Sequence, residues 1–107
     1  MATTQDYIEF VVEQIHTHYP VRRQKMFGEY TVYVNEKPFI LVCDNTVYVP
    51  ILPEIAELMA NAGKGIPYQG AKERYILDIE DTDTANKVID ILARVVPMPK
   101  HKKGNKQ

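Results

Sequence analysis

The segment between residues 24 and 49 constrains the fold of this chain most, because its side chains follow a two-residue period. In residues 30–34 the side chains at even positions face one way and those at odd positions the other, as in a strand. Residues 39–43 are apolar at every position, which predicts a strand covered on both faces, and residues 46–49 form a further strand. Two turn-forming stretches separate these strands, Asn35-Glu36-Lys37 and Asp44-Asn45. The segment therefore predicts consecutive strands joined by tight turns.

Helical periodicity precedes this segment. Thr3 or Thr4 can cap a first helix, and Asp6 in its first turn suits the helix dipole. The apolar stripe of this helix recurs at helical spacing and comprises Ile8, Val11, Val12, Ile15 and Tyr19. We expect Pro20 to end the helix, because the residue before a proline is disfavoured in the α region.

The second half of the chain predicts two further helices and one strand. Pro53 suits the first turn of a short helix that runs to about Ala62 and stops at Gly63. The glycine-rich segment 63–70 is expected to be a mobile surface loop, and residues 75–79 predict the last strand. Thr82 or Asp83 caps a final helix, whose buried stripe comprises Val88, Ile89, Leu92, Val95 and Val96. These elements predict an α+β fold: a sheet of about five strands with an N-terminal helix, a short middle helix and a C-terminal helix.

Composition limits the class of protein. With 107 residues the chain has the length of one domain, which we place at residues 1–97, and residues 98–107 are expected to be a disordered basic tail. The net charge of -1 gives no overall attraction to nucleic acid or to an anionic membrane. Cys43 is the single cysteine, and neither a secretory signal nor a membrane-spanning apolar run is visible, so we expect a cytoplasmic protein.

Residue spacing assigns no catalytic, metal or cofactor-binding site. His16 and His18 are two residues apart, so a regular helix would point them in different directions. Cys43 lies in the most apolar strand, which favours a buried, inert thiol over a nucleophile. The acidic residues at 78–83 lack the spacing of a calcium loop, and segment 63–70 lacks that of a phosphate-binding loop. We therefore expect no enzyme activity and no cofactor.

The stretch Arg22-Arg23-Gln24-Lys25 is a basic cluster that runs directly into Met26-Phe27-Gly28. An RNA-recognition strand also combines a basic residue, a glycine and alternating aromatic residues that stack on bases. Here Glu29 occupies a position that needs an aromatic side chain, and the register sends Tyr30 to the wrong face relative to Phe27. The chain also opens with a helix, whereas that fold opens with a strand. The similarity to an RNA-binding sheet is therefore superficial.

A different resemblance covers about Val21–Leu92. Lys25-Met26-Phe27-Gly28 leads into a strand, the turn Asn35-Glu36-Lys37 and a second strand that ends at an Asp-centred turn, Asp44. Further along the chain lies Gly65-Ile66-Pro67-Tyr68. In this order these stretches resemble the TfoX N-terminal domain family, whose members carry a basic residue before Met-Phe-Gly-Gly-Tyr-Gly.

The resemblance implies an α+β domain with an antiparallel sheet, helices on one face and a homodimer, without enzyme activity, cofactor or catalytic residue. Family members that regulate natural competence and sugar-responsive transcription carry a second, helical domain, which we do not expect in a chain of this length. Glu29 and Thr31 stand where the family usually has glycines around the tyrosine, which marks a divergent member.

Two groups of residues receive different roles. We assign Met26, Phe27, Gly28 and Tyr30 to structure, with Gly28 permitting a bend or a close approach of the backbone. Candidate partner-binding residues are Arg22, Arg23, Lys25, Tyr68, Lys72 and Arg74. The leading hypothesis is a non-enzymatic interaction module that assists transcriptional regulation through an unknown protein partner. The alternative is direct nucleic-acid binding through Arg22–Lys25 and the lysine tail, which would weaken steeply with salt.

Overall fold

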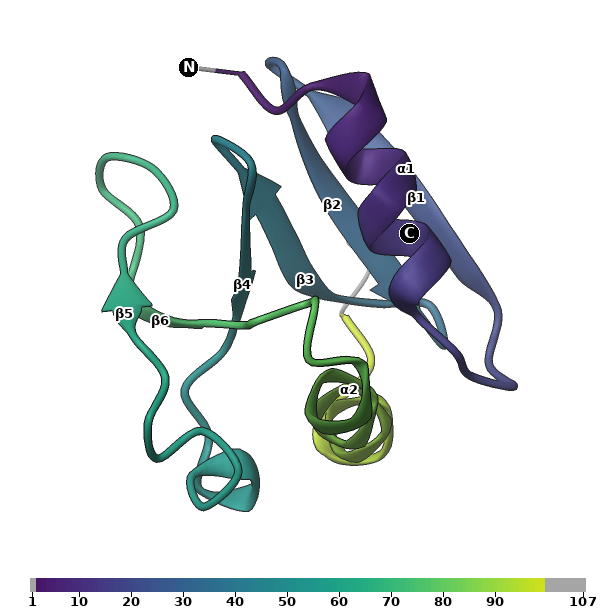
Figure 1. Ribbon diagram of the computed structural model, residues 1–107, viewed down its shortest axis with the longest axis vertical. Helices are drawn as coiled ribbons and strands as arrows, with labels where there is room; N and C mark the ends of the chain where they lie inside the picture. Colours follow the sequence, from purple (N-terminus) through teal and green to yellow (C-terminus); the bar gives the residue numbers. More distant parts are fainter. Residues whose placement is uncertain (1, 100–107) are drawn as a thin grey trace, which may run out of the picture.

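The computed structural model describes residues 2–99 and consists of one antiparallel sheet with helices on one face (Figure 1). The elements are α1 (Gln5–Gln14), β1 (Val21–Met26), β2 (Glu29–Val34), β3 (Lys37–Cys43), β4 (Thr46–Val49), a 3-10 helix η1 (Pro53–Ile55), β5 (Lys64–Gly65), β6 (Arg74–Ile76) and α2 (Thr82–Val95). The six strands lie in the order β1-β2-β3-β4-β6-β5. The predicted α+β class is confirmed, with six strands where about five were expected. Residues 100–107, which make up most of the predicted basic tail, lie outside the described residues.

Three two-residue turns join β1 to β4. Their residues all have positive φ: 53° and 81° at Phe27-Gly28, 56° and 62° at Asn35-Glu36, and 51° and 54° at Asp44-Asn45. Such turns match the twist of an antiparallel hairpin. The turn at Phe27-Gly28 separates β1 from β2, so β2 begins at Glu29, one residue before the predicted strand at residues 30–34. Lys37, which we expected in a turn, is the first residue of β3.

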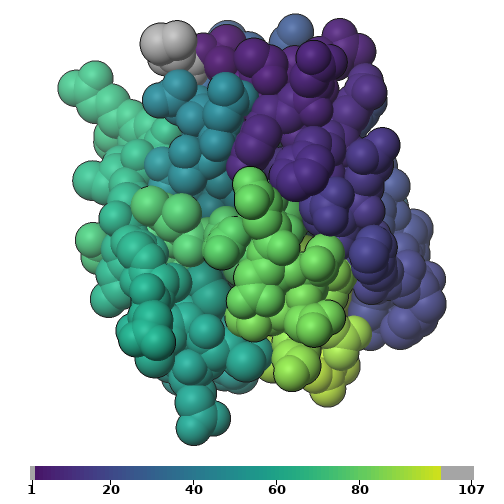
Figure 2. Space-filling model, viewed as in Figure 1, coloured from purple at the N-terminus to yellow at the C-terminus, as the bar shows by residue number. Residues whose placement is uncertain are grey.

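The core lies between the sheet and the helices. Residues directly opposite each other on neighbouring strands share a face, so Tyr30, Val42 and Val47 form one row beneath the helices. Ile8 and Val11 of α1 pack on this face, as does the stripe of α2, which comprises Val88, Ile89 and Leu92. Figure 2 shows α1, α2 and the segment that follows β4 together covering this side, which we call the helix face.

The opposite side of the sheet carries no described helix, and we call it the open face (Figure 1). Strand register places one row of side chains across it, namely Gln24, Thr31, Leu41, Tyr48 and Ile76. None of the described helices is both long and apolar enough to cross a membrane.

The first helix ends six residues before Pro20, so the predicted end is wrong. Thr4 caps its start by accepting a hydrogen bond from Tyr7 N at 3.1 Å. At the other end, Asn86 of α2 donates from Nδ2 to Gln14 O at 2.9 Å and accepts from His16 N at 2.7 Å. A side chain 72 positions away therefore satisfies backbone groups at this helix end.

The middle helix is also shorter than predicted. Only Pro53–Ile55 is regular, and turns follow as far as Asn61. Ile55 and Met59 are buried against the core, and Met59 N donates to Ile55 O at 3.0 Å within these turns. At the next boundaries, β6 ends at Ile76 rather than at Ile79, and Asp81 caps α2 by accepting from Thr84 N.

Candidate functional site

An apolar cleft of about 560 Å³ opens on the open face of the sheet. Its lining residues are Met26, Phe27, Glu29, Tyr30, Thr31, Leu41, Cys43 and Tyr68. Figure 1 shows the tip of the β1–β2 hairpin, the β3–β4 turn and the β5–β6 loop at the same end of the sheet. The fold thus brings Tyr68 to Met26, Phe27 and Thr31, which are far from it in sequence. We call this feature the open-face cleft.

Phe27 is the most unusual residue of the cleft. The residue is 96% exposed, and its backbone has a φ of 53°. A bulky residue in this left-handed region is an outlier that costs about 1–2 kcal/mol, and hairpin turns of this kind favour asparagine or glycine. Local folding preference therefore does not explain a phenylalanine here. Strained residues of this kind concentrate at functional sites.

The hairpin tip is exposed. Met26 and Phe27, which we assigned to structure, both lie outside the core, and Met26 is 55% exposed. Phe27 sits in the turn rather than in a strand, so strand register assigns its exposed side chain to neither face of the sheet. Tyr30 is buried in the core on the helix face.

Gly28 lies against the N-terminal segment. Its φ is 81°, and a Cβ at this position would lie 3.1 Å from Ala2 Cβ. Gly28 O also accepts a hydrogen bond from Thr3 N at 3.1 Å. The close approach that we expected of this glycine is thus made to the residues that precede α1.

Glu29 connects three segments at this end of the sheet, a role that no sequence pattern indicated. Its Oε1 accepts from Thr3 N at 3.0 Å, from Thr3 Oγ1 at 2.7 Å and from Asp44 N at 3.1 Å. Asn45 adds to the same network, because its Oδ1 accepts from Thr4 N at 3.0 Å. The carboxylate holds the hairpin tip, the N-terminal segment and the β3–β4 turn together beside the open-face cleft.

The basic residues of β1 do not share one surface. Arg22 lies on the open face, where its guanidinium stacks 3.8 Å from the Tyr33 ring centroid and its Nε lies 3.2 Å from Glu36 Oε1. Arg23 and Lys25 pair with Val32 and Tyr30 and therefore lie on the helix face. Arg23 Nη2 is 3.9 Å from Glu9 Oε2 of α1. The cluster seen in the sequence is thus divided between the two sides of the sheet.

The other candidate residues lie near the β5–β6 loop. Tyr68 is 60% exposed and lines the cleft, whereas Lys72 is exposed in the loop and does not line it. Arg74 is half-buried on β6, and its positive charge opposes the rise in the pKa of Cys43. That pKa is raised by burial of the thiol and, to a lesser extent, by the nearby Glu29 carboxylate.

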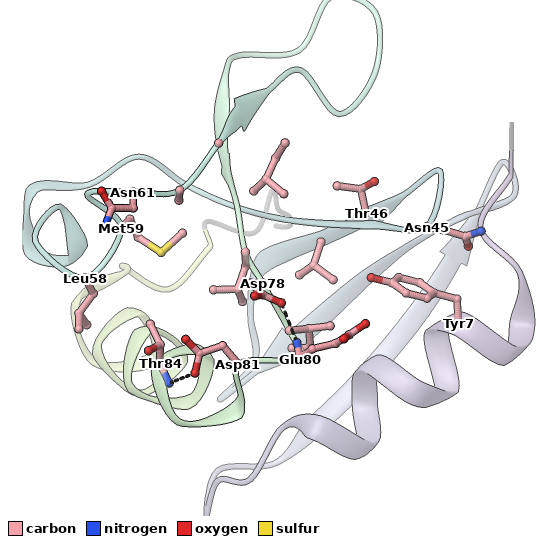
Figure 3. Close-up of a pocket in the computed structure, with 16 residues that line it drawn as sticks. Tyr7, Asn45, Thr46, Leu58, Met59, Asn61, Asp78, Glu80, Asp81 and Thr84 are labelled. Carbon is pink, nitrogen blue, oxygen red and sulfur yellow. Dashed lines mark hydrogen bonds between the residues drawn. The ribbon is translucent and has the colours of Figure 1, made fainter.

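A second cavity, of about 670 Å³, lies on the helix face. Figure 3 shows Tyr7 reaching into it from α1 toward Glu80, with Asp78 and Asp81 on the connection between β6 and α2. Burial and the charges of Glu80 and Asp78 raise the pKa of Tyr7. Two of the acids have structural roles, because Asp78 Oδ1 accepts from Glu80 N at 3.1 Å and Asp81 caps α2.

The histidines lie in the connection between α1 and β1 rather than on a helix. His16 is exposed, and the ring of His18 lies 4.2 Å from that of Tyr19. Within residues 2–99, no three histidine, cysteine, aspartate or glutamate side chains lie close enough to hold a metal ion.

Comparison with known proteins agrees with the fold and the motif. The model of the TfoX N-terminal domain matches residues 13–89, which include all six strands and the turn at Phe27-Gly28. A protein of Spirochaeta aurantia described as an uncharacterized 12.7 kDa protein in the trpE 5′ region is 35% identical over 106 residues. That similarity covers 97% of this chain and 92% of the relative. The chain belongs to the TfoX N-terminal domain family.

Proposed function

We propose that this protein is a non-enzymatic interaction module that assists transcriptional regulation in the cytoplasm through a protein partner. The observation that carries the proposal is Phe27, a fully exposed aromatic residue on left-handed backbone at the mouth of an apolar cleft. Aromatic side chains are enriched at the energetic centres of protein interfaces, and an apolar cleft beside one offers a pocket for a partner's side chain. The family membership supports a regulatory role.

The charge distribution favours a protein partner over nucleic acid. Nucleic-acid affinity comes mainly from cations that contact successive phosphates along one surface. Here Arg22 is on one side of the sheet and Arg23 and Lys25 are on the other. The two arginines also have acidic neighbours, Glu36 and Glu9. The open-face cleft is lined mostly by uncharged side chains, which suits an apolar protein surface.

Capture of partners with an immobilised full-length chain tests the proposal. The variant is Phe27→Asn, because asparagine tolerates the positive φ of this turn and lacks the aromatic ring. Ile51→Asn is the matched control, because Ile51 is an exposed apolar residue outside the cleft lining. Quantitative mass spectrometry of proteins retained from an extract of the source cells is the measurement.

We expect wild type and Ile51→Asn to retain at least one protein equally. Phe27→Asn should retain about tenfold less of that protein, because truncating a residue at the centre of an interface weakens binding by about this factor. Equal retention by all three chains would remove Phe27 and the cleft from partner binding. We also propose, from the family, that the chain forms homodimers. A monomeric mass by light scattering at high micromolar concentration would contradict that part alone.

A further inference from the structure

The strand β1 forms the long free edge of the sheet. It has six residues and pairs on one side with β2, whereas the strand at the other edge, β5, has only two. Free strand edges present unpaired N–H and C=O groups to which another strand can bind. Five of the six residues of β1 have exposed side chains.

The register shows which backbone groups point outward. Met26 and Glu29 close a two-residue turn, so that pair exchanges both hydrogen bonds. Every second residue of β1, namely those with even numbers, therefore bonds to β2 through its backbone. The hydrogen bond from Asn35 N to Pro20 O at 3.0 Å, just before β1, agrees with this alternation. The N–H and C=O groups of Val21, Arg23 and Lys25 therefore point away from β2. Within residues 2–99, no hydrogen bond occupies the outward groups of Arg23 or Lys25.

The charges of β1 suit a ligand that runs along this edge. A ligand over the open face would meet Arg22 alone, and one over the helix face would meet only Arg23 and Lys25. A strand added to the edge extends the sheet, so its side chains project on both faces and reach all three cations. The three basic side chains lie on two faces of the sheet, which disfavours nucleic-acid binding. An added strand can contact all three, because its own side chains also project on both faces.

The same charges determine which strand fits. A second copy of β1 would bring arginine and lysine side chains opposite one another, and like charges in facing positions destabilise a sheet. A strand that carries carboxylates on both faces would place them beside these cations. The ion pairs of Arg22 with Glu36 and of Arg23 with Glu9 are about half exposed and therefore weak, so they can be shared with incoming carboxylates.

We propose that β1 is an acceptor edge for an extended, acidic segment of the protein partner, which adds to the sheet as a seventh strand. This inference rests on the proposed function, because it assigns the partner a chemical class. Main-chain hydrogen bonds to Arg23 and Lys25 supply affinity, and the cations on both faces select an acidic sequence.

The test uses a labelled peptide of about eight residues, which is long enough to follow β1 at about 3.4 Å per residue. Glutamates occupy positions on both faces of the extended peptide, and valines occupy the rest. A second peptide of the same sequence is N-methylated at the nitrogens that would face β1, which removes its donors but keeps its charge. Binding to the full chain is followed by fluorescence anisotropy and by amide hydrogen exchange in NMR spectra.

We expect saturable binding of the first peptide and slower exchange at the amides of Arg23 and Lys25. The amides of Arg22 and Gln24, already bonded to β2, serve as internal controls and remain unchanged. N-methylation should weaken binding about tenfold or more. The double variant Arg23→Glu, Lys25→Glu should no longer bind the glutamate peptide and should instead bind a peptide in which lysines replace the glutamates.

Any of four results would overturn strand addition: no binding of the glutamate peptide, equal affinity for the N-methylated peptide, no slowing at Arg23 and Lys25, or tighter binding of a single-stranded oligonucleotide at the same amides. The Phe27→Asn chain separates the two proposals, because it lacks the ring but keeps β1. If it binds the peptide normally while losing the partner, both proposals stand. If the peptide never binds while Phe27→Asn still loses the partner, strand addition alone fails.

Discussion

Single residues at the hairpin tip differ in how well local folding preferences explain them. Phe27 occupies a backbone conformation that suits asparagine or glycine, whereas Gly28 next to it occupies one that glycine favours. The family motif therefore contains one residue with a local structural reason and one without. We attribute the second to contact with a partner.

Gly28→Val should destabilise the protein by about 1–3 kcal/mol, because the new side chain meets Ala2 and the backbone has positive φ. Gly70→Val is the control, since Gly70 has a φ of 89° but nothing within 4 Å of a Cβ. Thermal scans should show a larger loss for Gly28→Val than for Gly70→Val. A melting temperature equal to that of wild type would show that Gly28 has no structural role.

The pKa of Cys43 predicts its reactivity. Burial, aided by Glu29, raises this pKa, so the thiolate forms only at a pH above the usual range for a thiol. The rate of iodoacetamide alkylation should therefore rise at higher pH in the folded protein than in the same chain unfolded in urea. The sign also implies that any stability linked to this thiol is present at neutral pH and declines in alkali. Coincident pH profiles for the folded and unfolded chains would contradict the assigned environment.

At the scale of elements, long-range polar contacts set boundaries that local sequence signals do not. Asn86 ends α1 before Pro20, and Glu29 connects two turns and the N-terminal segment. Lys37 is a third case: it is buried at the start of β3, and its Nζ donates to Ala93 O at 2.7 Å near the end of α2. This bond satisfies a carbonyl at the negative end of the helix.

Lys37→Met should destabilise the protein by about 1.5–3 kcal/mol, because the aliphatic volume remains while a charge-assisted hydrogen bond is lost. Lys87→Met is the control, since Lys87 is exposed on the same helix that Lys37 contacts. Urea unfolding followed by circular dichroism measures both. If the two variants had equal midpoints, the contact with Ala93 would contribute nothing to stability.

At the scale of the whole molecule, the sequence predicted what depends on neighbours and missed what depends on distant contacts. The turns at Asn35-Glu36 and Asp44-Asn45 were recognisable, because asparagine and aspartate, which begin them, tolerate positive φ. At Phe27-Gly28 the sequence indicated only a bend or a close approach of the backbone at Gly28, since phenylalanine rarely occupies such a turn position. The family could be identified from its motif even though the motif's exposure could not.

The open-face cleft illustrates the same limit. Tyr68 was a candidate because it lies in a glycine-rich loop, and Met26 and Phe27 were noted for their motif, but nothing local placed them beside one another. The division of Arg22 from Arg23 and Lys25 follows from strand register, which became known only when the hairpin turn was located. The faces on which these three basic residues lie thus depend on where this turn is.

The free energy of unfolding of Phe27→Asn, from urea denaturation, tests the central claim most directly. If Phe27 is kept for binding rather than for folding, asparagine should relieve the backbone strain and raise that free energy by about 1 kcal/mol. A loss of stability of the same size would show that the exposed ring supports the fold, which would contradict this account of Phe27.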